Sequence, residues 1–216
     1  MLLWLKMVQD HLEPSWMRLG PCPKTTGDPL LYSLKKGIYN EYVKIPEHVN
    51  NVTFIGEGPT KTRITGNTSD NDVLTTFKTA TVVVSGDGFM ARGIGFENMA
   101  GPLKYQAVAL HVSGDMAIFY NCAMNGYQDT LYAHSNCQFY RPCTITGTID
   151  FIFGDASAIF QDCKMIVRKP LDNQVCTVTA QGRTNRTSKG ALVLQGCTIT
   201  TVLKQGTATT IAPNSP

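Results

Sequence analysis

The sequence predicts an all-β fold built as a parallel β-helix, and three observations support this prediction. From Leu30 onward, short runs rich in Val, Ile, Phe, Tyr and Thr are separated by Gly, Asn and Asp, the pattern typical of strands and turns. Helical periodicity is nearly absent from the same region. Similar segments recur about every 21 residues, which indicates a solenoid whose turns stack on one another.

The composition is that of a single folded domain and excludes several classes of protein. The chain has 216 residues, of which 16% are charged, and its net charge is +3. These values exclude a disordered or collagen-like protein, and the charge is too weakly basic for a nucleic-acid binder. The longest apolar run near the start is Met1–Leu5, so we expect neither a membrane span nor an export signal.

The chain divides into two unequal parts. Residues 1–29 contain four prolines and are predicted to form an irregular leader or linker, with a short helix at residues 2–12 at most. Residues 30–216 are predicted to form the β-helical domain.

Two series of repeats define the expected turns of this domain. The apolar anchors of the first series are Phe96, Phe119, Phe139, Phe160 and Leu194, and the segments of the second begin at Val108, Leu131, Phe151 and Val178. We therefore expect two strands in each turn of a β-helix. The alternative is a β-sandwich with fortuitous spacing.

Cysteine and histidine form no metal-binding pattern in the sequence. The seven cysteines include no Cys-x-x-Cys pair, and the histidines, among them His111 and His134, are scattered. We therefore expect no structural metal. The odd number of cysteines leaves at least one thiol unpaired.

Polar residues at the repeat spacing predict a functional site. Gln106, Gln128 and Asp150 follow one another at equal intervals, each close to the length of one repeat, and Asp129 directly follows Gln128. Stacked turns would place these two amides and two carboxylates in one patch. A solvated polar face is the simpler interpretation, but both aspartates directly precede strongly apolar strands, which favours a site.

Two carboxylates on adjacent turns, near an apolar wall, suit acyl or glycosyl transfer. Mutual repulsion separates their proton affinities, so that one ionised carboxylate acts as nucleophile while its protonated neighbour acts as general acid. The glutamine amides would donate hydrogen bonds to a developing oxyanion. The Gly-x-Ser-x-Gly motif of serine hydrolases is absent from the sequence.

Three segments carry a resemblance to a known family. Residues 106–110, 127–132 and 150–154 resemble the signature blocks of plant pectinesterases, also called pectin methylesterases. The resemblance extends from about Leu34 to Leu203. It implies a right-handed parallel β-helix that removes methyl groups from the galacturonic acid of pectin, without a metal or other cofactor.

The resemblance also implies roles for individual residues. Asp150 would be the nucleophile, Asp129 the proton donor and later base, and Gln128 the oxyanion stabiliser. The residues expected to contact substrate are Thr76, Gln106, Tyr132 and Phe89, although a place in the core explains the last two equally well. A disulfide would join Cys143 and Cys163, which are separated by about one repeat and are therefore expected on stacked turns.

The match to the family pattern is incomplete at both ends. The Gly-Arg-Pro-Trp block, whose arginine pairs with the nucleophile, does not occur before Pro216, and the opening strand expected between Trp16 and Tyr32 is missing. We therefore expect a partial domain, truncated at both ends and of marginal stability. The alternative functions are a catalytically impaired pectin-binding remnant and a glycosidase that uses the same carboxylates.

The remaining expectations concern partners and location. The resemblance implies pectin as substrate and a proteinaceous pectinesterase inhibitor as a further partner, with no nucleic acid and no membrane, for a monomeric protein. It also implies an extracellular protein of the plant cell wall. Three glycosylation sequons, at Asn51, Asn67 and Asn185, agree with export.

Overall fold

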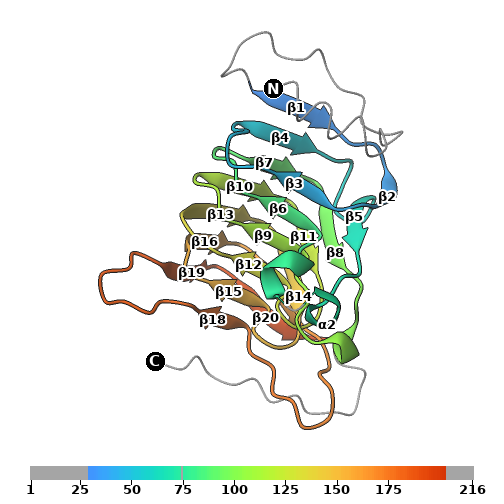
Figure 1. Cartoon of the computed structure of the whole chain (residues 1–216), viewed down its shortest axis with the longest axis vertical. Helices are drawn as coiled ribbons and strands as arrows, with labels where there is room; N and C mark the ends of the chain where they lie inside the picture. The colour runs from blue at the N-terminus through green and yellow to red at the C-terminus, as the bar shows by residue number, and fades with distance from the viewer. Residues whose placement is uncertain (1–28, 74, 203–216) are drawn as a thin grey trace.

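The computed structural model describes residues 29–73 and 75–202, which form a parallel β-helix (Figure 1). Each full turn of the chain contributes one strand to each of three parallel sheets, here named A, B and C. Sheet A contains β1 (Leu30–Ser33), β4 (Val52–Ile55), β7 (Met90–Arg92), β10 (Ala117–Tyr120), β13 (Cys137–Arg141), β16 (Ser157–Gln161) and β19 (Ala191–Gln195).

The other two sheets follow sheet A around each turn. Sheet B contains β2 (Gly37–Asn40), β5 (Thr62–Gly66), β8 (Gly95–Asn98), β11 (Ala123–Asn125), β14 (Thr144–Gly147), β17 (Lys164–Val167) and β20 (Thr198–Thr201). Sheet C contains β3 (Val43–Ile45), β6 (Val82–Val84), β9 (Leu110–Val112), β12 (Leu131–Ala133), β15 (Ile152–Gly154) and β18 (Thr179–Gln181). The helical segments of the described residues are short: α2 (Asp70–Val73), η1 (Thr76–Thr79) and η2 (Pro102–Lys104).

The predicted β-helix is confirmed, but each turn contains three strands where the sequence predicted two. The inner row of sheet A also differs from the predicted series, because Phe119 pairs with Tyr140 and Tyr140 pairs with Phe160. Phe139 lies one residue out of this register and is half-buried, and Phe96 belongs to sheet B. Neighbouring side chains of a strand point to opposite faces, so an alignment error of one residue moves a side chain to the other face.

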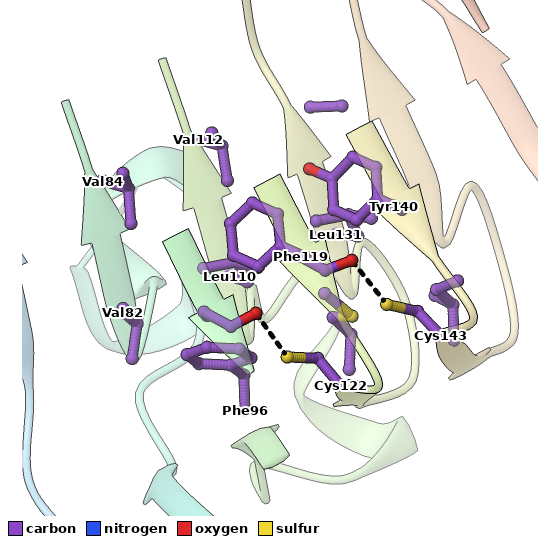
Figure 2. Close-up of a cluster of buried hydrophobic side chains, with 14 of the residues drawn as sticks. Val82, Val84, Phe96, Leu110, Val112, Phe119, Cys122, Leu131, Tyr140 and Cys143 are labelled. Atoms are coloured by element: carbon purple, nitrogen blue, oxygen red, sulfur yellow. Dashed lines mark hydrogen bonds between the residues drawn. The ribbon is translucent and has the colours of Figure 1, made fainter. Parts of the chain in front are cut away.

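A ladder of aromatic rings fills the inside of the β-helix. The rings of Phe119 and Tyr140 stack with their centroids 4.9 Å apart, and those of Tyr140 and Phe160 with theirs 4.6 Å apart. The ring of Phe89 lies 5.7 Å from that of Phe119 and continues the ladder toward the first turns. All four side chains are fully buried, and Figure 2 shows Phe119 and Tyr140 within this core. Burial of these rings holds successive turns in register.

A row of thiols follows the corner after sheet A. Cys122, Cys143, Cys163 and Cys197 each lie two residues beyond a strand of this sheet, on successive turns. All four are free, so Cys143 and Cys163 do not form the disulfide that the resemblance implied. The Cys143 amide donates to Cys163 Sγ at 3.3 Å. Figure 2 shows the second bond of this residue, in which the Cys143 thiol donates to the Phe119 carbonyl oxygen at 3.4 Å. These cysteines therefore lie on stacked turns without a covalent bond between them.

The predicted leader, residues 1–29, lies almost entirely outside the described residues, as does the end of the predicted domain, residues 203–216. The first described strand begins at Leu30. No helix within residues 29–73 and 75–202 has the length and hydrophobicity needed to cross a bilayer.

The aromatic ladder predicts that substitutions at adjacent positions of β10 lower the free energy of unfolding by very different amounts. Phe119→Ala removes a ring that is fully buried and should lower the free energy of unfolding by about 3–5 kcal/mol. Ile118→Ala changes the neighbouring residue, which is 39% exposed, and should cost clearly less, about 1 kcal/mol. Urea denaturation followed by far-UV circular dichroism measures both values, and equal losses would contradict the assignment of the inner face.

Candidate active site

The site begins with two aspartates at the same position of neighbouring turns. Leu131 of β12 pairs with Ile152 of β15, and Asp129 and Asp150 each come two residues before these partners. The Asp129 amide donates to the carbonyl oxygen of Ile149 at 3.0 Å, which keeps the two corners in register. Adjacent parallel strands are about 4.8 Å apart, so the two aspartates lie one strand spacing apart at the entry to sheet C.

Both aspartates adopt a left-handed backbone conformation. The φ angle is +62° at Asp129 and +47° at Asp150. Among residues other than glycine, Asp and Asn tolerate this region best, since their short side chains bond to the nearby backbone. The same conformation occurs at other corners of the fold, at Asn121 and Asp162. The left-handed corner is therefore a recurrent feature of this β-helix, and the two aspartates share it on neighbouring turns.

The turn that holds Asp129 is tightly bonded. The carbonyl oxygen of Tyr127 accepts from the Thr148 amide at 2.9 Å, and the Thr130 hydroxyl donates to the same oxygen at 3.1 Å. Gly147 packs against this turn: a Cβ added there would approach both the Phe151 side chain and the Tyr127 carbonyl oxygen. A side chain at position 147 would thus displace the turn, which explains the need for glycine.

The two glutamines lie beside the aspartates, although not in the register that the sequence predicted. The Ala107 amide donates to the carbonyl oxygen of Gln128 at 3.2 Å, so Gln128 stacks on Ala107 and Gln106 is displaced by one residue. The pairing of Leu131 with Leu110 and Ile152 sets the repeat of this part of the fold, and that repeat is one residue shorter than the interval between the glutamines. Gln106 and Gln128 are both half-buried and lie on adjacent turns.

The environments of the two carboxylates differ. Asp129 is 8% exposed whereas Asp150 is half-buried. Burial, assisted by the negative charges of Asp150 and then Asp70, raises the pKa of Asp129 to about 7. Asp129 therefore retains a proton at a pH where an ordinary aspartate is ionised.

An aromatic row extends from the aspartates along the outer face of sheet C. The ring of Tyr132 stacks on that of Phe153 with centroids 4.4 Å apart, and on that of His111 with centroids 4.7 Å apart. The fold also joins two histidines that the sequence analysis treated as scattered: His111 Nε2 lies 3.1 Å from His134 Nδ1. Burial, the neighbouring His134 and Lys44 lower the pKa of His111 to about 4.

No group of three or more His, Cys, Asp and Glu side chains within residues 29–73 and 75–202 is placed to hold a metal ion. The candidate site thus consists of two carboxylates, two amides and an aromatic row.

Comparison with known proteins places this arrangement in a family. A sequence model of the family described as Pectinesterase matches residues 19–212. The chain belongs to the pectinesterase family. A pectinesterase of Petunia integrifolia is 60% identical over 181 residues, which are 84% of this chain and 48% of that protein. The putative pectinesterase/pectinesterase inhibitor 28 of Arabidopsis thaliana is 55% identical over 82% of this chain and 24% of its own length. The chain therefore spans half or less of the length of these curated relatives.

Solved structures of pectin methylesterases share the fold. The enzyme from carrot has a TM-score of 0.81 and is 44% identical, over 84% of this chain and 57% of that chain. A pectin methylesterase solved in complex with a hexasaccharide has a TM-score of 0.76 and is 30% identical, over 85% of this chain and 60% of that chain.

The structure places the four residues expected to contact substrate in this pectinesterase-family chain in different environments. Gln106 is half-buried on the turn next to that of Gln128, as described above. Phe89 is fully buried and lies in the aromatic ladder beside Phe54 and Phe119, so the expectation that it contacts substrate is wrong. Tyr132 is half-buried on the outer face of sheet C. Thr76 is half-buried at the start of η1, and its neighbour Phe77 is 51% exposed.

Two aromatic residues were missed by the sequence analysis. Phe153 stacks on Tyr132, and strand alternation places it on the face opposite to the buried Ile152. The sequence could therefore have indicated that Phe153 faces outward, because this residue directly follows a residue that faces inward. Phe77 directly follows Thr76 within η1, a helical segment too short for any periodicity of the sequence to indicate which residue is exposed.

The raised pKa of Asp129 is directly measurable. Removing the neighbouring negative charge with Asp150→Asn should lower the pKa of Asp129 from about 7, because the ionised form of Asp129 is no longer repelled. Side-chain carbon NMR over a pH titration gives the value. As a control, Asp162→Asn changes another left-handed aspartate, paired with Arg141 at the corner after sheet A, and should leave the titration unchanged. A pKa of Asp129 near its ordinary value in the unsubstituted protein would contradict the burial argument.

Proposed function

We propose that this chain acts as an aspartyl esterase that removes methyl groups from methyl-esterified galacturonan, the polymer of pectin. The observation that carries the proposal is the placement of Asp129 and Asp150 on adjacent turns in different environments, with the pKa of Asp129 raised to about 7. Membership of the pectinesterase family supports the choice of reaction and substrate. The similar pectin methylesterase with a bound hexasaccharide supports a polymeric substrate.

Asp150 is the proposed nucleophile. It is half-buried, so a carboxylate oxygen remains accessible to the carbonyl carbon of a methyl ester. Attack forms a new C–O bond and moves the carbonyl electron pair onto the oxygen, which becomes an oxyanion. The side-chain amide of Gln128, next to Asp129, would donate a hydrogen bond to that oxyanion.

Asp129 is the proposed general acid and later the base. Its raised pKa keeps a proton available near neutral pH, and this proton passes to the departing methoxide to give methanol. In the second step, ionised Asp129 takes a proton from water, and the resulting hydroxide attacks the acyl carbon. Cleavage of the bond to Asp150 restores the enzyme and leaves a free carboxylate on the polymer.

The outer face of sheet C provides the proposed binding surface. Tyr132 and Phe153 offer a row of stacked rings whose outward edges would contact the C–H groups of sugar residues. Gln106 lies on the turn before Gln128 and would bind a sugar hydroxyl. Thr76 and the exposed Phe77 would contact the polymer from η1.

The proposal extends to partners and location. Pectin is an extracellular polymer of the plant cell wall, so a protein that acts on it would be found there. The names of Arabidopsis relatives combine pectinesterase with pectinesterase inhibitor, and a proteinaceous inhibitor is a further proposed partner of this chain.

Release of methanol from methylated pectin tests the reaction. Asp150→Asn should reduce the rate at least about 10⁴-fold, as loss of a nucleophile does, and Asp129→Asn about 10²–10⁴-fold. The rate of the unsubstituted protein should fall as the pH rises above the pKa of Asp129, about 7, because the proton donor is lost. Asp162→Asn serves as control and should leave the rate unchanged.

Three outcomes would overturn the proposal. Retention on a pectate column without release of methanol would show that the chain binds the polymer but does not hydrolyse its methyl esters. Formation of reducing ends without methanol would indicate a glycosidase. Full activity in Asp150→Asn would exclude this residue as the nucleophile.

A further inference from the structure

The inference concerns Tyr127, the residue directly before Gln128 and Asp129. Its carbonyl oxygen accepts from the Thr148 amide at 2.9 Å and from the Thr130 hydroxyl at 3.1 Å. These two bonds therefore fix the backbone of Tyr127, which directly precedes the left-handed turn at Asp129. Whatever holds Tyr127 also restricts the direction of the Asp129 carboxyl group.

The ring of Tyr127 lies against the guanidinium group of Arg168. The Arg168 Cζ atom is 4.7 Å from the centroid of the ring, well inside the roughly 6 Å range of a cation–π contact. Arg168 follows β17 directly, and its amide donates to the carbonyl oxygen of Gly147 at 2.8 Å. Both ends of the arginine are thus fixed, the backbone by the sheet and the side chain by the ring.

The contact reaches across an intervening turn. Asn125 pairs with Thr146, and Thr146 pairs with Ile166. Continuing this register by two residues places Tyr127, Thr148 and Arg168 on three successive turns. Thr148, the middle residue, is only 3% exposed. The backbones of Tyr127 and Arg168 are two strand spacings apart, about 9.6 Å. The long arginine side chain can span this distance, and the small side chain of Thr148 between them leaves room for it.

We propose that Arg168 is a positioning residue, which holds the turn of Gln128 and Asp129 in its buried conformation through the ring of Tyr127. Its role in catalysis rests on the proposed esterase function. Arg168 itself touches no reacting atom in this scheme. Loss of the contact would let water reach the turn and would disperse the orientations of the Asp129 carboxyl group.

The pKa of Asp129 provides a test that requires no turnover. If Arg168 acts through the turn, Arg168→Met should lower the pKa of Asp129 by about half a unit or more, because a loosened turn is better hydrated. If Arg168 acts only as a nearby positive charge, the same substitution should raise that pKa, since a stabilising cation is removed. Carbon NMR titration of the Asp129 carboxyl group distinguishes the two signs.

A second substitution separates the contact from the charge. Tyr127→Leu keeps the arginine but removes the ring, and it should lower the pKa of Asp129 in the same direction as Arg168→Met. The double variant should show no further shift, because both substitutions break one contact. Arg168→Lys keeps a cation able to lie over the ring and should retain most of the unsubstituted value. Lys164→Met, at an exposed position of the same strand, is the matched control and should have no effect.

Kinetics with methylated pectin complete the test. Arg168→Met should lower kcat about 10-fold or more while KM stays within about twofold, and Arg168→Lys should restore most of the loss. A raised KM with unchanged kcat would overturn the proposal in favour of direct substrate binding. An unchanged or raised pKa of Asp129 in Arg168→Met, or additive shifts in the double variant, would also overturn it.

The two proposals fail in different ways. Absence of methanol release from the unsubstituted protein would remove the esterase proposal while the titration of Asp129 still decides the role of Arg168. Circular dichroism checks that each variant folds. If Arg168→Met fails to fold, the titration of Asp129 in Tyr127→Leu tests the same contact.

Discussion

The hydrogen-bonded register of sheet C is the constraint on which the candidate site depends. Leu131 pairs with both Leu110 and Ile152, so three strands repeat at a constant spacing along the chain. This spacing brings the corners before β12 and β15 to equivalent positions and stacks Asp129 and Asp150. A shift of one residue would turn every side chain of a strand to the opposite face and separate the two carboxylates.

The interior explains why this register is stable. The fully buried rings of Phe119, Tyr140 and Phe160 lie in parallel along the axis, so each turn is packed against the next by contacts between aromatic rings as well as by backbone bonds. Sliding one turn would lose these contacts together. The core and the site are thus linked, because the turns that carry the inner rings also carry the corners that hold the aspartates.

The chemistry of the site follows from unequal burial of two equal groups. Asp129 is buried within its own tight turn, whereas Asp150 is half-buried. Desolvation opposes the ionised form more strongly at the buried position, and repulsion by the neighbouring carboxylate acts in the same direction. One aspartate keeps a proton and the other is less enclosed, which is the division of roles that the proposed ester hydrolysis needs.

The sequence by itself determined the β-helix, because a repeat of about 21 residues can be recognised from the order of residues alone, and through that repeat it predicted that Gln128, Asp129 and Asp150 lie on neighbouring turns. Only the tertiary structure decided which residues face inward. Phe89 and Phe153 have the same side chain, yet one is in the core and the other on the outer face of sheet C. The physical reason is that burial depends on the number of strands per turn and on a register exact to one residue, and both are set by pairing with distant strands.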